Sequence, residues 1–98
     1  MNDPIVFRHV AKIEYDQAAD WYEERSAGLG VVFATAIQHI LDRIAKQADF
    51  YPRVLEQVRE ALVPSFPYCI YYVEEERRIV VLSVFHTSRD PMIWQNRA

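Results

Sequence analysis

The sequence feature that most constrains this fold is a pair of apolar stretches that follow one another near the C-terminal end. Residues 68–73 read Tyr-Cys-Ile-Tyr-Tyr-Val, and residues 78–86 consist almost entirely of Ile, Val, Leu and Phe. β-Branched and aromatic residues favour strands. The charged segment 74–77, Glu-Glu-Glu-Arg, separates the two stretches in the manner of a hairpin connection. The pattern therefore predicts two consecutive strands joined by a short turn.

Two other segments are typical of strands. Residues 5–7, Ile-Val-Phe, come directly after a proline, and residues 58–63 alternate between two sets of side chains. Pro64 and Pro67 fall between expected strands, where a missing N–H does least harm. These segments predict a small sheet built mainly from the second half of the chain.

The first half of the chain has helical periodicity instead. In residues 12–25 apolar side chains recur at spacings of three and four, with acidic residues between them, and residues 31–46 carry a second apolar stripe. The segment 26–30, Ser-Ala-Gly-Leu-Gly, interrupts the pattern. A short connection between two amphipathic helices predicts an antiparallel helical hairpin.

Helices followed by consecutive strands indicate the α+β class. We expect one domain over residues 1–98, with the N-terminal helical hairpin packed on one face of a small antiparallel β-sheet. Residues 92–97, after a proline, are expected to form a final helical turn.

The last expected strand is apolar on both faces. Strict alternation gives one set of Ile79, Val81 and Phe85, and another of Val80, Leu82 and Val84. A helical hairpin can cover only one face of a small sheet. We therefore expect another chain to cover part of the second face, because large exposed apolar patches usually mark interfaces.

Composition narrows the classes of function. The chain has 98 residues, a net charge of −3 and a pI near 5.5, whereas proteins that grip nucleic acid broadly carry a basic excess. One cysteine allows no disulfide within the chain, and neither a zinc pattern nor any other metal motif occurs. We expect no cofactor and no metal, and no nucleophile elbow or phosphate-binding glycine loop appears.

The expected location is the cytoplasm. The first four residues, Met-Asn-Asp-Pro, contain no basic or apolar region of a signal peptide. The longest apolar run, residues 79–85, is far too short to span a bilayer. We therefore expect no membrane partner.

Several short motifs, each weak alone, are specific in their order and spacing. In chain order they are Ala18-Ala19-Asp20-Trp21-Tyr22, Gly28-Leu29-Gly30, Tyr51-Pro52-Arg53-Val54, Phe66-Pro67-Tyr68-Cys69-Ile70-Tyr71-Tyr72, Ile79-Val80-Val81-Leu82-Ser83-Val84-Phe85-His86, Arg89-Asp90-Pro91 and Trp94. Together they resemble the RelE/ParE superfamily of toxins from type II toxin–antitoxin modules, often called plasmid stabilisation proteins. The resemblance covers about residues 5 to 94, and the Phe-Pro-Tyr-x-Ile-Tyr-Tyr and His-x-x-Arg-Asp-Pro strings are most similar to the ParE-like branch.

The resemblance implies a helical hairpin on an antiparallel sheet and a cognate antitoxin that folds along the toxin and neutralises it. Two activities occur in the superfamily. ParE-like members poison DNA gyrase, whereas RelE-like members cut mRNA on the ribosome by attack of the 2′-hydroxyl on the adjacent phosphate. That chemistry needs a proton acceptor, a proton donor and positive charge for the developing phosphorane.

This sequence departs from the nuclease pattern at three places. Val63-Pro64-Ser65 stands where many relatives carry arginine, and Cys69 stands where nuclease members can have a basic residue. Trp94 lies near the position of a terminal tyrosine and offers no titratable oxygen. Together with the acidic pI, these departures favour a binding inhibitor over a nuclease.

Three residues are candidates for catalysis if the chain is a nuclease: Arg59, His86 and Arg89. Each has a structural alternative. Arg59 can be an edge-strand arginine paired with a glutamate, His86 can close the sheet through a hydrogen bond, and Arg89 can pair with Asp90 or a helix end.

Four residues are candidates for binding the target or the antitoxin: Arg53, Tyr68, Tyr72 and Trp94. Tyr68 and Tyr72 are expected to share one face of their strand, where aromatic core is the alternative role. Trp94 can instead pack the C-terminal turn onto the sheet.

Three functions follow in order of preference. The first is a ParE-like toxin that binds DNA gyrase and is held silent by its antitoxin. The second is a ribosome-dependent mRNA endonuclease. The third is an inactive toxin-like domain retained as an antitoxin-binding partner. A homodimer is a further partner to consider.

Overall fold

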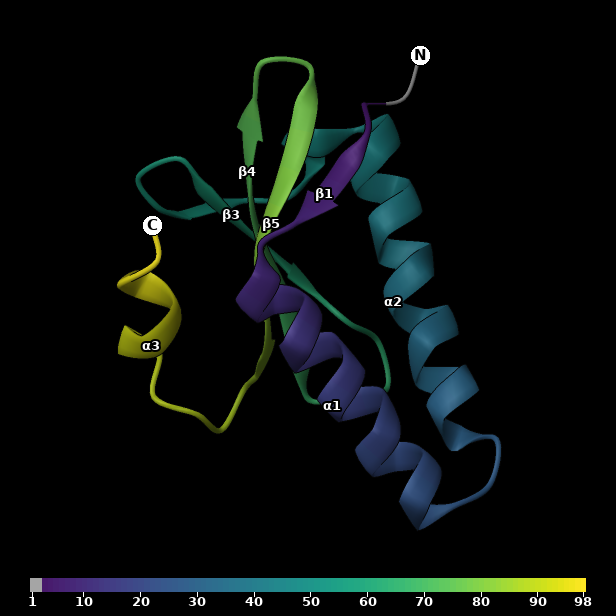
Figure 1. Cartoon of the computed structure of the whole chain (residues 1–98). Helices are drawn as coiled ribbons and strands as arrows, with labels where there is room; N and C mark the ends of the chain where they lie inside the picture. Colours follow the sequence, from purple (N-terminus) through teal and green to yellow (C-terminus); the bar gives the residue numbers. More distant parts are fainter. Residues whose placement is uncertain (1–2) are drawn as a thin grey trace.

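The computed structural model describes residues 3–98. The first two residues of the expected domain lie outside the described part, and with them the start of the N-terminal segment that was compared with a signal peptide. Two helices precede most of the strands (Figure 1). The elements are β1 (Ile5–Phe7), α1 (His9–Arg25), α2 (Leu29–Lys46), the 3-10 turn η1 (Ala48–Phe50), β2 (Arg53–Leu55), β3 (Val58–Leu62), β4 (Tyr68–Glu75), β5 (Arg78–His86) and α3 (Met92–Gln95). This order confirms the expected α+β class.

The strands form one sheet in the order β1-β5-β4-β3-β2. Neighbours from β2 to β5 are antiparallel, whereas β1 lies parallel to β5 at the other edge. A parallel pair requires a long crossover connection, which the two helices and the intervening strands provide. The expected antiparallel sheet is therefore confirmed for β2 to β5, and β1 adds a parallel pair at its edge. The short edge strand β2 was not expected at all.

The two long helices meet in a hairpin closed by glycine and by Glu23. The Glu23 carboxylate accepts the backbone N–H of Gly28 at 2.9 Å and that of Gly30 at 3.0 Å, so it caps the N-terminus of α2. A Cβ on Gly30 would lie 2.7 Å from the carbonyl oxygen of Ala19, so only glycine permits this close approach. Gly28 has φ +88°, in the left-handed region that glycine adopts without strain.

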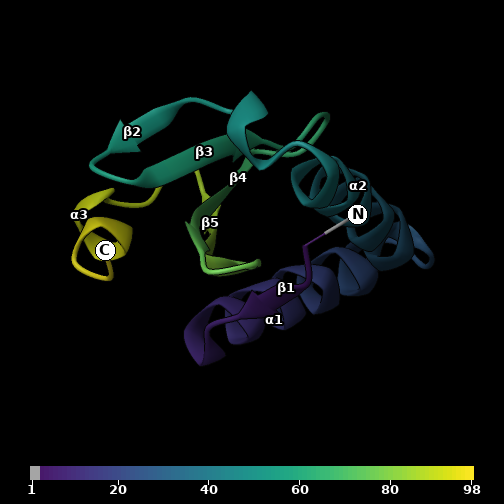
Figure 2. The same cartoon turned by 90° about the horizontal axis from the view of Figure 1, so that it is seen from above.

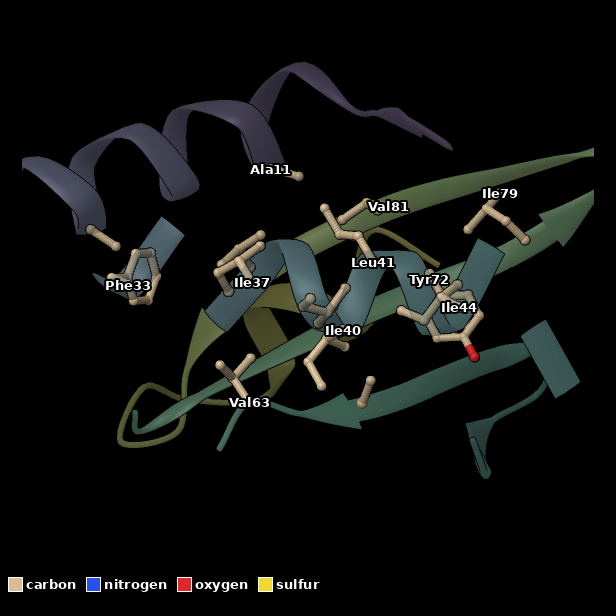
Figure 3. Close-up of a cluster of buried hydrophobic side chains, with 14 residues drawn as sticks. Ala11, Phe33, Ile37, Ile40, Leu41, Ile44, Val63, Tyr72, Ile79 and Val81 are labelled. Atoms are coloured by element: carbon tan, nitrogen blue, oxygen red, sulfur yellow. The ribbon is translucent and has the colours of Figure 1, made fainter. Parts of the chain in front are cut away.

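The helical hairpin covers one face of the sheet and encloses the main core. Phe33, Ile37 and Ile44 of α2 are fully buried against strand residues that include Ile79 and Val81 (Figure 3). Full burial of each such side chain contributes about 1.5–3 kcal/mol. The expected apolar stripe of α2 thus faces the sheet.

A β-bulge interrupts the pairing of β4 with β5. Tyr71 lies opposite Ser83, but the next residue, Tyr72, lies opposite Val81, so Leu82 is an extra residue in β5. A bulge of this kind shifts the alternation of side chains along the strand.

The bulge changes which β5 side chains share a face. Val84 joins Val81 in the cluster under the helices, and Phe85 joins Leu82 in the cluster on the other face. The expected sets, with Phe85 beside Val81 and Val84 beside Leu82, were wrong because they assumed unbroken alternation.

The middle of the second face of the sheet is covered by the chain itself. Trp94 of α3 is 3% exposed and stacks on Tyr71 with ring centroids 3.9 Å apart and an interplanar angle of 12°. Figure 2 shows α3 on the opposite side of the sheet from α1 and α2. Val80, Leu82 and Phe85 are buried in this second cluster. Leu62 and Val6, which pair with Cys69 and Val80 on this face, are still 64% and 38% exposed, so another chain on part of this face stays a prediction.

Candidate functional site

A groove of about 800 Å³ lies between α1 and the end of the sheet where β4 begins and β5 finishes. One wall is the outer side of α1, and the opposite wall is formed by the start of β4, the end of β5 and the segment that follows it. The lining side chains are those of Val10, Ile13, Glu14, Gln17, Ala18, Trp21, Tyr22, Pro67, Tyr68, Val84, His86, Ser88, Arg89 and Arg97.

Glu14 is the polar centre of this groove. Its side chain is only 9% exposed, and its two oxygens accept hydrogen bonds from four partners. These are the Ser83 hydroxyl at 2.8 Å, the Val84 N–H at 3.3 Å, Arg89 at 2.7 Å, and Arg97 at 2.9 and 3.2 Å. A buried carboxylate requires such pairing, because an unpaired buried charge is very costly.

Arg89 links the groove to the second face of the sheet. One terminal nitrogen donates to Glu14, and the guanidinium carbon lies 4.8 Å from the centroid of the Phe85 ring, within the range of a cation–π contact. The side chain is still 40% exposed. Arg89 therefore pairs with Glu14, and neither expected alternative, Asp90 or a helix end, is its partner.

His86 is held by the turn that follows β5. The backbone N–H of Ser88 donates to Nδ1 at 3.1 Å, and the Ser88 hydroxyl lies 2.8 Å from the same nitrogen. Because a backbone N–H can only donate, Nδ1 is an acceptor, and the proton of the neutral ring is on Nε2. The structural role expected for His86, closing the end of the sheet, thus exists alongside its position in the groove.

Tyr68 pairs with His86 across the two strands, and their rings meet edge to face with centroids 5.1 Å apart. Burial raises the pKa of the Tyr68 hydroxyl above 10.0; Tyr22 and Glu14 raise it further, while Arg89 lowers it. Tyr68 therefore keeps its proton at neutral pH. It can donate a hydrogen bond in the groove, but it cannot serve as a proton acceptor.

Arg59 does not belong to this groove. Its side chain is 11% exposed and donates to Glu74 at 3.2 Å and to the Tyr51 carbonyl at 2.6 Å. These contacts match the structural alternative, an arginine paired with a glutamate. Arg59 lies opposite Tyr72, four residues along β4 from Tyr68, which corresponds to about 13 Å. The three candidate catalytic residues are not brought together.

Among the candidate binding residues, Tyr72 and Trp94 are buried. Tyr72 shares a face with Tyr68, as expected, but it is fully enclosed in the core, and its hydroxyl donates to the Ala48 carbonyl at 2.5 Å. Trp94 packs the C-terminal turn onto the sheet. Neither is accessible to a partner in this conformation. Arg53 is exposed on the edge strand β2, away from the groove.

The outer side of α1 adds an exposed apolar wall to the groove. Val10 and Ile13 are each 39% exposed and Trp21 is 50% exposed, and all three line the cavity. The guanidinium of Arg25 lies over the Trp21 ring at 4.3 Å. We call Val10, Ile13 and Trp21 the α1 wall.

Glu14 and Arg97 were not predicted from the sequence as residues of the site. A signal for Glu14 existed: it lies three residues after Ala11 and four before Ala18, the two buried residues of α1, so helical spacing places it on the inward side. An acidic residue on the buried side of a helix needs a partner. No sequence signal identifies that partner as Arg97, which lies 83 positions away.

The arrangement of a helical hairpin on a five-stranded sheet with α3 behind it is the RelE/ParE fold, as expected. The chain is similar to a solved structure of the chromosomal ParDE TA system from P. aeruginosa, with a TM-score of 0.63 and 14% sequence identity. The match covers 88% of this chain and 97% of that chain. The sequence matches no protein-family model and no curated protein.

Residues 3–98 contain neither a helix suited to spanning a membrane nor a cluster of metal ligands. None of the helices in this range combines the length and the apolar character needed to cross a membrane. In the same range, no group of three or more His, Cys, Asp or Glu side chains is arranged to hold a metal ion.

Proposed function

We propose that this chain is the toxin of a type II toxin–antitoxin module, of the ParE-like branch. The observation that carries the proposal is the fold similarity to the ParDE system, which extends over 88% of this chain and nearly the whole of the other. The ordered motifs from Ala18 to Trp94 point to the same branch. Fold alone does not define function, so the proposal also rests on what the groove can do.

The proposed toxin acts in the cytoplasm by binding, with DNA gyrase as its target. Three features of the structure favour binding over RNA cleavage. Arg59 is held elsewhere by Glu74 and Tyr51. Tyr68 is kept protonated by burial. The Glu14 carboxylate neutralises part of the positive charge that a phosphorane would need.

The proposed antitoxin occupies the groove and covers the α1 wall. Val10, Ile13 and Trp21 together expose apolar surface beside a charged cluster, which is the composition expected of a protein-binding surface. The groove, with the α1 wall beside its charged cluster, is therefore the surface that we assign to this partner.

The test is to induce the chain alone in bacteria and to follow DNA and protein synthesis side by side by pulse-labelling. A fall in DNA synthesis before protein synthesis is expected. If protein synthesis falls first, the chain is an RNA-cleaving enzyme and the ParE-like proposal is overturned. If growth continues while the folded chain accumulates, the chain is an inactive toxin-like domain.

A further inference from the structure

Beside the saturated Glu14 carboxylate, the groove presents hydrogen-bond donors that no group within residues 3–98 uses. One terminal nitrogen of Arg89 donates to Glu14, so Nε and the other terminal nitrogen have no protein partner in this range. The proton on Nε2 of His86 and the hydroxyl of Tyr68 have no acceptor among these residues either. All three side chains line the same cavity. We call Tyr68, His86 and Arg89 the donor set.

We propose that the donor set receives a carboxylate from an amphipathic helix of a partner protein, whose apolar residues pack on the α1 wall. A guanidinium with two free nitrogens can hold a carboxylate in a bidentate pair, and a neutral imidazole N–H and a phenol O–H each add one donor. In the described part of the groove, no free carboxylate competes for these donors, because Glu14 is already saturated by four partners.

The charge of the groove matches a single carboxylate. Its charged lining residues are Glu14, Arg89 and Arg97, so one positive charge remains after Glu14 is paired. A nucleic-acid strand requires several cations along its path. Here the exposed side of α1 carries Asp16 and Asp20, in a chain with net charge −3. The groove therefore favours a single carboxylate over a phosphate backbone.

The shape of the wall favours a helix as the partner. Val10, Ile13, Gln17 and Trp21 recur at spacings of three and four along one side of α1 and span about 16 Å at 1.5 Å per residue. Such a row of side chains packs best into the grooves of another helix. A partner helix of about three turns would lie along this row, with its acidic residue directed at Arg89.

This inference rests on the proposed function only for the identity of the partner, which would be the antitoxin. Carboxylate recognition itself can be measured on the whole chain with 4-phenylbutyrate, which joins an apolar ring to a carboxylate. The matched neutral probe is 4-phenylbutanamide, and binding is followed by two-dimensional NMR of the 15N-labelled protein.

We expect the carboxylate to bind in the millimolar range and at least about tenfold more tightly than the amide. Resonances of Tyr68, His86 and Arg89 should shift. The preference for the carboxylate should be lost in Arg89→Gln and largely kept in Arg89→Lys. The matched control is Arg53→Gln, which removes an exposed arginine on the opposite side of the sheet and should bind as the unchanged chain does. The same spectra report whether each variant is folded.

Equal binding of the two probes, no binding of either, or an equal loss in the Arg53 variant would overturn the inference. Tighter binding of phenyl phosphate or of a short single-stranded RNA would assign the groove to phosphates instead. None of these readouts depends on toxicity. A chain that arrests growth without a carboxylate preference refutes this inference alone, whereas carboxylate binding without growth arrest refutes the proposed toxin activity alone.

Discussion

Glu14 is the residue that holds the groove together. Its carboxylate is the common acceptor for a hydroxyl, a backbone N–H and two guanidinium groups, which come from β5 and from the segment after it. Loss of one partner from a buried charged network costs much more than a surface ion pair contributes, because the remaining charges are left uncompensated.

Replacement of Glu14 by glutamine should therefore destabilise the fold. The amide keeps the shape but lacks the charge and places an N–H2 group against arginine donors, so we expect a loss of about 2–4 kcal/mol. Urea unfolding followed by circular dichroism measures it. The control is Asp16→Asn in the exposed pair with Lys12, which should change stability by less than about 1 kcal/mol. Similar losses in both variants would show that Glu14 is not a hub.

The buried tyrosines predict a loss of stability in alkali. Burial and the hydrogen bond to Glu60 at 2.7 Å raise the pKa of Tyr71 far above its ordinary value of 10.0, and burial does the same for Tyr72. Since the folded pKa is the higher one, this stabilisation is complete below pH 10 and declines as the pH rises above it. Urea midpoints measured at increasing pH should fall in this range. The fall should be shallower in Tyr71→Phe, and an equally steep fall would contradict the assignment.

At the scale of elements, α3 packs against the second face of the sheet. This four-residue helix places Trp94 on the second face of the sheet, where its ring stacks on Tyr71. The centre of this face is thereby covered without a second chain. A short C-terminal segment thus does for this face what the two long helices do for the other.

Removal of the Trp94 ring should expose that face. Trp94→Ala should cost about 3–5 kcal/mol, as for other large-to-small changes in a core, and should increase the binding of a dye that reports apolar surface. The neighbouring control, Ile93→Ala, removes a partly exposed side chain and should have a much smaller effect. Unchanged dye binding in Trp94→Ala would mean that other residues cover the sheet.

The sequence was sufficient for the elements and insufficient for the groove. Periodicity identified both long helices, and the bounds of β5 matched the expected 78–86. The faces of β5 were wrong because the bulge at Leu82 depends on pairing with β4, which local alternation does not reveal. Glu14 and Arg97 were missed because their contact joins positions 83 residues apart. Arg59 and Tyr72 are residue types that suit catalysis and binding, the roles expected for them, but both side chains are enclosed by packing.

At the scale of the whole molecule, the layers leave the α1 wall uncovered. The helices α1 and α2 cover one face of the sheet and α3 lies on the other (Figure 2), whereas the side chains of the α1 wall are exposed. The proposal of an antitoxin complex makes a direct prediction there.

A charge on the α1 wall should separate toxicity from neutralisation. Ile13→Asp places a carboxylate on an exposed apolar position, so the chain should fold normally but lose affinity for its antitoxin by about 10–100-fold. Co-expression with the antitoxin, followed by co-purification, measures this. Val31→Asp on α2, exposed but outside the groove, is the control and should still be neutralised. Normal neutralisation of Ile13→Asp would remove the wall from the interface.

The separation of Glu14 from its partners along the chain also sets the order in which the molecule is completed during synthesis. Glu14 leaves the ribosome early with α1. The donors to its carboxylate oxygens belong to residues 83, 84, 89 and 97, which are synthesised much later. Contacts of such high sequence separation form late in folding. The nascent polypeptide therefore cannot present a finished groove. The surface that we propose for the partner protein comes into being only once translation has passed Arg97.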